Sequence, residues 1–204
     1  MFGFPKDEIK RKTFHILTLI YVAAYWFLPR SIVLWGLAIA ILVVLAGEFV
    51  RARNEKFNVF ILKVLGGVHR ESETHKISGL PWTLTGAFLV ILLFGEKNIF
   101  VLASFLYLAF GDAVAALFGK AYGKHKIYAG KSWEGTIACF TACFIIGLIL
   151  FGTAGVAGFG TVILFSFLGA VMAAFIETIP WPLNDNLWMQ VLNAGVLTLL
   201  ASIL

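Results

Sequence analysis

Asp112 is a carboxylate inside a predominantly apolar run of residues, and its position suggests chemistry. It follows Gly111 about two helical turns before the end of the run 98–118. A carboxylate at such a depth in an apolar helix requires a charged partner or a water-filled cavity. Because aspartate oxygens bind Mg²⁺ and can also accept a proton, Asp112 is predicted to be functional.

The segment after Asp112 combines glycines with lysines. Glycine allows the backbone to come close to a bulky anion, and lysine supplies positive charge. Ser132 is predicted to cap the helix that follows, so that the positive end of this helix points into the segment. A helix N-terminus with adjacent cations is a phosphate site. The residues concerned are Gly119, Lys120, Gly123, Lys124, Lys126, Gly130, Lys131 and Ser132.

Gly130, Lys131 and Ser132 resemble the end of a Walker A phosphate loop, but the rest of that motif is missing. The motif needs a preceding strand and a glycine five residues before Gly130, where this sequence has His125. We therefore reject this interpretation. Lysines are expected on the inner side of any membrane protein, so the glycines and Asp112 are the more specific signal.

The composition places these residues in a membrane protein. Of the 204 residues, 60% are hydrophobic and 13% are charged, which is about half the charged share of a soluble domain. The mean hydropathy is +0.92. The same composition excludes disordered chains, and two cysteines are too few for a disulfide-rich secreted scaffold. We expect a single domain, 1–204, without a nucleic-acid partner.

The apolar runs predict an all-α, polytopic membrane bundle of about seven transmembrane helices, since each crossing needs about 20 apolar residues. The runs are continuous rather than alternating, which argues against strands. They are Thr13–Leu28, Ser31–Val50, Leu80–Phe94, Asn98–Phe118, Gly135–Phe151, Thr161–Ile176 and Leu187–Leu204.

The 16 lysines and arginines predict the orientation of this bundle. Four lie in the N-terminal segment, six in the loop after the second span and four in the loop after the fourth. Only Arg30 and Lys97 lie on the opposite side. This asymmetry predicts an inside N-terminus and an outside C-terminus. Residues 54–68 are predicted to be either an interfacial amphipathic helix or a packed loop helix.

The predicted topology brings six ionisable groups from distant parts of the chain to the inner face. One is the imidazole of His15, in the first turn of the first span. The others are the carboxylates of Glu48, Asp112, Glu134, Glu177 and Asp185. Any one of them near a helix end could simply reach water, but their convergence indicates a common site.

The order of short motifs along the chain resembles the CTP-dependent lipid kinases, which include dolichol, phytol and farnesol kinases and a CTP-dependent diacylglycerol kinase. The central motifs are Gly-Asp-x-x-Ala, Gly-x-x-x-Gly and Lys-Ser-x-Glu-Gly, within residues 111–135. Similar to other family motifs are Arg11-Lys12-x-x-His15, Glu48-x-x-Arg51, and Arg70 with Glu73 and Gly79. Glu177 with Asn184-Asp185-Asn186 resembles a C-terminal motif, although Asn184 stands where aspartate is common.

The resemblance implies transfer of the γ-phosphoryl group of CTP to the hydroxyl of a membrane lipid alcohol such as a polyprenol, dolichol or phytol. Mg²⁺ is implied as the cofactor, with Asp112, Glu177 and Asp185 as its candidate ligands. The catalytic base could be Asp112, Glu134 or His15, and the sequence does not choose among them. The residues implied in nucleotide binding are Arg11, Lys12, Gly111, Gly119, Lys120, Gly123, Lys124, Lys131, Ser132 and Asn186.

Two other functions stay open. Phosphatidate cytidylyltransferases carry a similar Lys-x-Trp-Glu-Gly loop, but their C-terminal signature is basic and this chain has no Lys, Arg or His after Gly135. A small cation transporter could bind its ion with Asp112 and Glu177, but the chain shows no internal repeat. We expect a multi-pass enzyme with a cytoplasmic active site, in a prokaryotic cell membrane or in a eukaryotic ER-type membrane.

Overall fold

The structure is a computed structural model that describes residues 6–17, 19–64, 77–95, 98–128, 130–156 and 158–203. Within these ranges it contains helices and one isolated bridge between Lys126 and Ser132, which confirms the all-α class. The helices are α1 (Lys6–Leu17), α2 (Ile20–Phe27), α3 (Arg30–Arg53), α4 (Glu55–Val64), α5 (Gly79–Phe94), α6 (Asn98–Leu106), the π-helical η2 (Tyr107–Asp112), α7 (Ala113–Tyr122), α8 (Trp133–Thr153), α9 (Phe159–Thr178) and α10 (Asp185–Ile203).

Among the described residues, five helices are long and apolar enough to cross a membrane. They are α3, α8, α9, α10 and the continuous helix Ile99–Tyr122, which contains most of α6 together with η2 and α7. α5 is also apolar but has only 16 residues. These helices indicate a membrane protein, whereas the count of seven spans stays a prediction.

The first predicted span, Thr13–Leu28, is divided between two short helices. α1 ends at Leu17, and the backbone N–H of Leu19 donates to the carbonyl of Ile16 at 3.0 Å in the turn before α2. No proline or glycine causes this break. α1 carries most of its charges in its first two turns and contacts α7 and η2, whereas the apolar α2 contacts α3. Different packing partners therefore separate the two helices.

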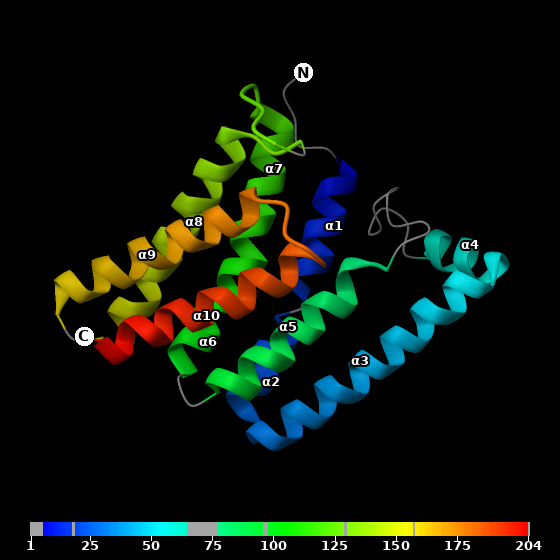
Figure 1. Cartoon of the computed structure of the whole chain (residues 1–204), viewed down its shortest axis with the longest axis horizontal. Helices are drawn as coiled ribbons and strands as arrows, with labels where there is room; N and C mark the ends of the chain where they lie inside the picture. The colour runs from blue at the N-terminus through cyan, green and yellow to red at the C-terminus, as the bar shows by residue number, and fades with distance from the viewer. Residues whose placement is uncertain are drawn as a thin grey trace.

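The helix ends that carry the predicted site lie toward one end of the bundle. Figure 1 shows the start of α1, the ends of α7 and α9 and the starts of α8 and α10 on the same side. The α2–α3 turn and the C-terminus lie toward the opposite side. From one long helix to the next, the chain runs alternately between these two sides, as the predicted order of membrane crossings requires. The assignment of the first side to the cytoplasm stays a prediction.

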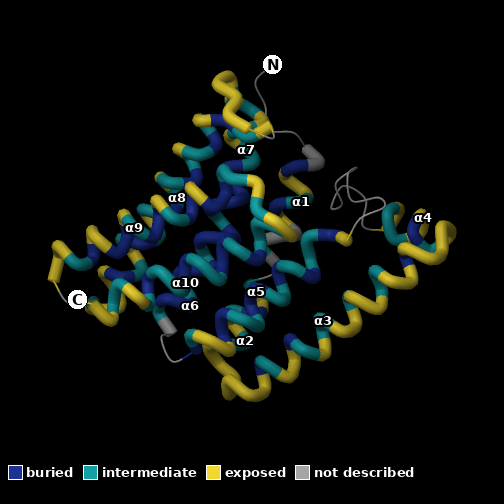
Figure 2. The backbone as a smooth tube through the Cα atoms, in the orientation of Figure 1, coloured by how far each residue is buried: buried dark blue, intermediate teal, exposed yellow. Residues whose placement is uncertain are grey.

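The buried residues concentrate where α6, η2, α8, α9 and α10 meet. Tyr107 and Phe165 belong to this apolar cluster, and Val90 and Phe105 belong to a second cluster that includes α2, α3 and α5. Figure 2 shows that α3, by contrast, is exposed along most of its length. Its exposed side chains are largely apolar, as expected for a helix that faces lipid.

α4 falls within the predicted amphipathic segment 54–68. Val59, Phe60 and Val64 are exposed, whereas Asn58 is buried and its side-chain carbonyl accepts a hydrogen bond from Arg51 at 3.2 Å. An exposed apolar face on a short helix suits the surface of a membrane. The interfacial location stays a prediction, and residues 65–68 lie outside the described part of the chain.

Candidate functional site

Asp112 ends a π-helical segment inside the long helix Ile99–Tyr122. The segment η2 interrupts the α-helical geometry from Tyr107 to Asp112, and such interruptions are frequent at functional sites. Gly111 lets this segment lie against α8, because a Cβ at that position would come within 2.5 Å of the Cys143 sulfur. Asp112 is therefore held in a buried, tightly packed part of the bundle.

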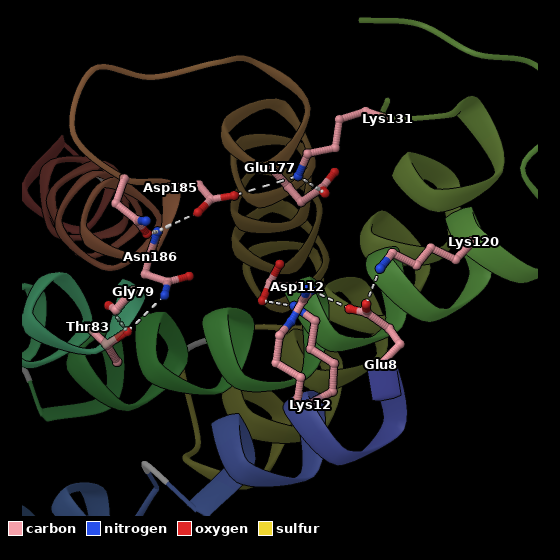
Figure 3. Close-up of polar contacts among 12 residues, drawn as sticks. Glu8, Lys12, Gly79, Thr83, Asp112, Lys120, Lys131, Glu177, Asp185 and Asn186 are labelled. Atoms are coloured by element: carbon pink, nitrogen blue, oxygen red, sulfur yellow. Dashed lines mark hydrogen bonds and ion pairs between the residues drawn. The ribbon is translucent and has the colours of Figure 1, made fainter. Parts of the chain in front are cut away.

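Lys12 is the charged partner of Asp112. The two side chains form an ion pair between α1 and the end of η2, and both are almost completely buried (Figure 3). A buried carboxylate requires such a partner, as the sequence predicted for Asp112. A phosphate-binding role for Lys12 stays a prediction.

Glu8 forms a second set of ion pairs between α1 and α7. Its buried carboxylate contacts Arg11 on its own helix and Lys120 on α7. Glu8 is absent from the sequence-based site, although an acid three residues before Arg11 in a basic segment is a recognisable signal. Carboxylates thus engage three of the predicted phosphate-binding cations, namely Arg11, Lys12 and Lys120.

The lysine-rich loop between α7 and α8 is a tight turn. Its backbone pairs Ile127 with Lys131 at 3.0 Å and Trp133 with His125 at 3.0 Å. Gly130 has φ +80°, a left-handed conformation that glycine adopts without strain. At the end of the turn, Ser132 accepts a hydrogen bond from the backbone N–H of Gly135 at 3.2 Å, which confirms the predicted N-cap of α8.

The glycines around this loop allow close packing of α7 and α8. A Cβ at Gly135 would come within 2.8 Å of the Ala115 carbonyl oxygen, and one at Gly123 within 2.5 Å of the Ser132 hydroxyl. A Cβ at Gly119 would lie 3.2 Å from the same hydroxyl. The close packing of α7 and α8 therefore explains why these positions are glycine. Their approach to a bound anion stays a prediction.

Lys131 joins the loop to the acids of α9 and α10. Its ammonium pairs with Glu177, which is buried, and lies 3.6 Å from Asp185 (Figure 3). Burial alone disfavours the charged form, but the neighbouring carboxylates, Glu177 first, outweigh it and raise the pKa of Lys131. Lys131 therefore stays protonated beside these acids.

The two remaining candidates for the catalytic base are placed differently. Glu134, in the first turn of α8, accepts hydrogen bonds from His125, at 2.7 Å from the ring Nδ1 and 3.2 Å from the backbone N–H. The ring of His125 is largely exposed on the loop, as are Lys124 and Lys126. The side chain of His15 lies outside the described part of the structure.

Glu48 belongs to another polar cluster, between α3 and the start of α5. Its carboxylate accepts from Arg51 at 2.6 Å and from Ser78 at 2.7 Å. The two charged residues of the motif Glu48-x-x-Arg51 thus form an ion pair, and Gly79 starts α5 beside it. Arg70 and Glu73 lie outside the described residues.

The carboxylates near Lys12 and Lys131 fit a magnesium ion that arrives with a nucleotide. In the described part of the chain, no three His, Cys, Asp or Glu side chains are grouped closely enough to hold a metal ion by themselves. Mg²⁺ usually takes one or two carboxylates and completes its shell with water and substrate phosphates. Asp112, Glu177 and Asp185 supply carboxylate oxygens of this kind. In the structure each of the three carboxylates faces a lysine ammonium.

Comparison with known proteins gives one family and two relatives. The model of a family described as the cytidylyltransferase family matches residues 6–176, which include Asp112 and the lysine-rich loop. An uncharacterised protein of Rickettsia prowazekii is 31% identical over 183 residues, or 88% of each chain. The CTP-dependent diacylglycerol kinase 1 of Schizosaccharomyces pombe is 27% identical over 164 residues, or 76% of this chain and 74% of that protein. No solved structure matches.

Proposed function

The chain belongs to the cytidylyltransferase family, and from that premise we propose that it is a CTP-dependent lipid kinase. In this proposal the γ-phosphoryl group of CTP moves to the hydroxyl of a membrane lipid alcohol, such as a polyprenol, dolichol or phytol. The similarity to a CTP-dependent diacylglycerol kinase supports CTP as the donor and a lipid as the acceptor. The apolar helices support an acceptor that resides in a membrane.

The observation that carries the proposal is the grouping of Lys131 before α8, Glu177 at the end of α9 and Asp185 at the start of α10. Phosphoryl transfer depends on positioning and charge neutralisation. Lys131 and the positive end of the α8 dipole would attract phosphate oxygens, together with Lys120 and Lys124. Glu177 and Asp185 would hold Mg²⁺, which would neutralise charge on the triphosphate when bound.

The lipid hydroxyl needs a base, and the geometry favours Asp112. Asp112 lies within the apolar helix Ile99–Tyr122, whereas Glu134 lies in the first turn of α8 and is engaged with the exposed His125. The hydroxyl proton would move to the Asp112 carboxylate as the hydroxyl oxygen bonds to the γ-phosphorus. The bond between that phosphorus and the bridging oxygen then breaks, and CDP leaves. Lys12 would stabilise the Asp112 carboxylate between turnovers.

The charge distribution favours a hydroxyl acceptor over a phosphate acceptor. A cytidylyltransferase must hold the phosphate of its lipid in addition to the nucleotide. Residues 132–204 contain no Lys, Arg or His, and the N-terminal cations Arg11 and Lys12 already pair with carboxylates. A neutral alcohol requires no such additional cations.

Following the phosphorus of CTP tests the proposal. Purified protein is incubated with Mg²⁺ and a panel of lipid alcohols, using CTP labelled at the γ- or the α-phosphate. We expect the γ label in the lipid and the α label in CDP, without pyrophosphate. Lipid that carries the α label, with release of pyrophosphate, would identify a cytidylyltransferase instead. The panel also identifies the acceptor alcohol.

A further inference from the structure

The first turn of α10 is attached to α5 through the Thr83 side chain. Thr83 is almost completely buried, and its hydroxyl donates to the Gly79 carbonyl oxygen at 3.1 Å. The side-chain amide of Asn186 donates to the same hydroxyl oxygen at 2.9 Å (Figure 3). Thr83 therefore connects the interior of one helix to the residue that directly follows Asp185.

The chemistry of the threonine hydroxyl sets the orientation of the Asn186 amide. A hydroxyl has one proton, and here it is used toward Gly79, so the oxygen can only accept from Asn186. The amide nitrogen must therefore face Thr83. Figure 3 shows the amide oxygen of Asn186 turned away from Thr83, toward the side of Asp112. Valine at position 83 would keep the shape of threonine, but it has no hydroxyl oxygen to accept from the amide nitrogen of Asn186 and so to fix the orientation of that amide.

A second contact fixes the same pair of helices one turn further along α10. The Gln190 amide donates to the Thr83 carbonyl at 3.0 Å and to the Asn186 carbonyl at 2.9 Å. Gly86 leaves room for this side chain, since a Cβ there would come within 2.5 Å of the Gln190 nitrogen. The two contacts together determine where α10 begins.

The position of Asp185 depends on this attachment because the connection from α9 is irregular. Residues 179–184 contain two prolines, and Leu183 has φ +73°, a left-handed conformation that is strained for a residue with a side chain. Asp185 must nevertheless remain 3.6 Å from Lys131, which also pairs with Glu177. A shift of the first turn of α10 would separate Asp185 from this cluster.

We propose that Thr83 is a positioning residue of the active site, which holds Asn186 and the first turn of α10 so that Asp185 stays beside Lys131. Its effect on turnover rests on the proposed kinase function. Thr83 itself touches neither Lys131 nor Glu177 in the contacts described, so it acts through Asn186.

Three variants of α5 test this role in the full-length protein. Thr83→Val removes the hydroxyl, Thr83→Ser keeps it, and Thr85→Val is the matched control two residues away on the same helix. Kinetics follow transfer of the γ label from CTP. A spin label on Leu183→Cys, an exposed position, independently reports the mobility of the turn before α10. Labelling is confined to this position because Cys139 and Cys143 are fully buried.

We expect Thr83→Val to lower kcat/KM for CTP roughly 10- to 100-fold, because small displacements of catalytic groups have effects of this size. KM for the lipid alcohol should not change, and the label at position 183 should become more mobile. Thr83→Ser and Thr85→Val should behave as the wild type. If Thr83→Val does not fold, Asn186→Ala removes the same hydrogen bond from the other helix, and the mobility of the label at position 183 is then the deciding measurement, because Asn186 is itself a predicted nucleotide-binding residue.

Two outcomes would overturn the inference while leaving the kinase function intact. In the first, the label mobility and kcat/KM of Thr83→Val equal those of the wild type. In the second, Thr83→Ser is as impaired as Thr83→Val, so that the hydroxyl is not the cause. A wild type that transfers no γ label would instead contradict the proposed function, and the label mobility alone would then decide the role of Thr83.

Discussion

Lys12 and Asp112 are both buried, so each charge depends on the other. The pair joins α1 to the end of η2 across 100 positions of sequence. Removing one member of a buried ion pair takes a counter-charge from the other, whereas neutralising both members removes the two charges together. This property allows a structural contribution of Asp112 to be separated from a catalytic one.

We predict that Asp112→Asn abolishes phosphoryl transfer and also lowers the free energy of unfolding, because the buried Lys12 loses one of its counter-charges. The double variant Lys12→Met with Asp112→Asn should recover most of the stability but none of the activity. Thermal unfolding in detergent and γ-label transfer measure the two properties. Recovery of activity in the double variant would show that Asp112 is structural only.

Ser132 contributes to stability through its cap of α8. Ser132→Ala should lower the free energy of unfolding by about 1 kcal/mol, since the Gly135 N–H loses its acceptor. Ser202→Ala, at an exposed position near the end of α10, serves as the control and should have almost no effect. Equal unfolding temperatures for the two variants would argue against the cap.

At the scale of elements, α7 and α8 approach each other through small residues. Gly119 and Gly135 lie at the closest point of this helix pair. The approach places the start of α8, with Ser132 and Lys131, next to the end of α7. The geometry of the lysine-rich loop therefore depends on the glycines even where they contact no ligand.

Gly135→Ala should destabilise the protein by about 1–3 kcal/mol, because the added carbon would lie 2.8 Å from a backbone oxygen, which cannot move independently. Gly36→Ala is the matched control within α3, where no atom lies within 4 Å of the added carbon. It should be neutral or stabilise the helix by up to about 1 kcal/mol. Unfolding of both variants in the same detergent provides the comparison.

At the scale of the whole molecule, the helix ends that carry the candidate site lie toward one end of the bundle (Figure 1), and the charge asymmetry predicts that this end faces the cytoplasm. Tyr128→Cys in the lysine-rich loop and Ala154→Cys between α8 and α9 are both exposed positions. A membrane-impermeant thiol reagent added to intact cells should label position 154 only. Labelling of position 128 from outside would reverse the orientation.

The sequence alone was sufficient for those features that depend on composition and local spacing. Apolar runs of about 20 residues predict membrane helices because the bilayer sets the length. Ser132 was identified as a helix cap because its interaction with Gly135 is local. Asp112 and Lys131 were identified because a carboxylate in an apolar helix, and a lysine beside glycines at a helix start, are visible in the sequence itself.

Only the tertiary structure decided which charges meet. The partner of Asp112 is Lys12, that of Lys120 is Glu8, and Thr83 holds Asn186 from 103 positions away. Such pairs depend on how helices pack, and residue spacing along a single chain carries no information about contacts between distant helices. The same reason explains the break between α1 and α2, where packing against α7 and α3 outweighed a continuous helical pattern. Local physics thus indicated the candidate groups, and helix packing determined their partners.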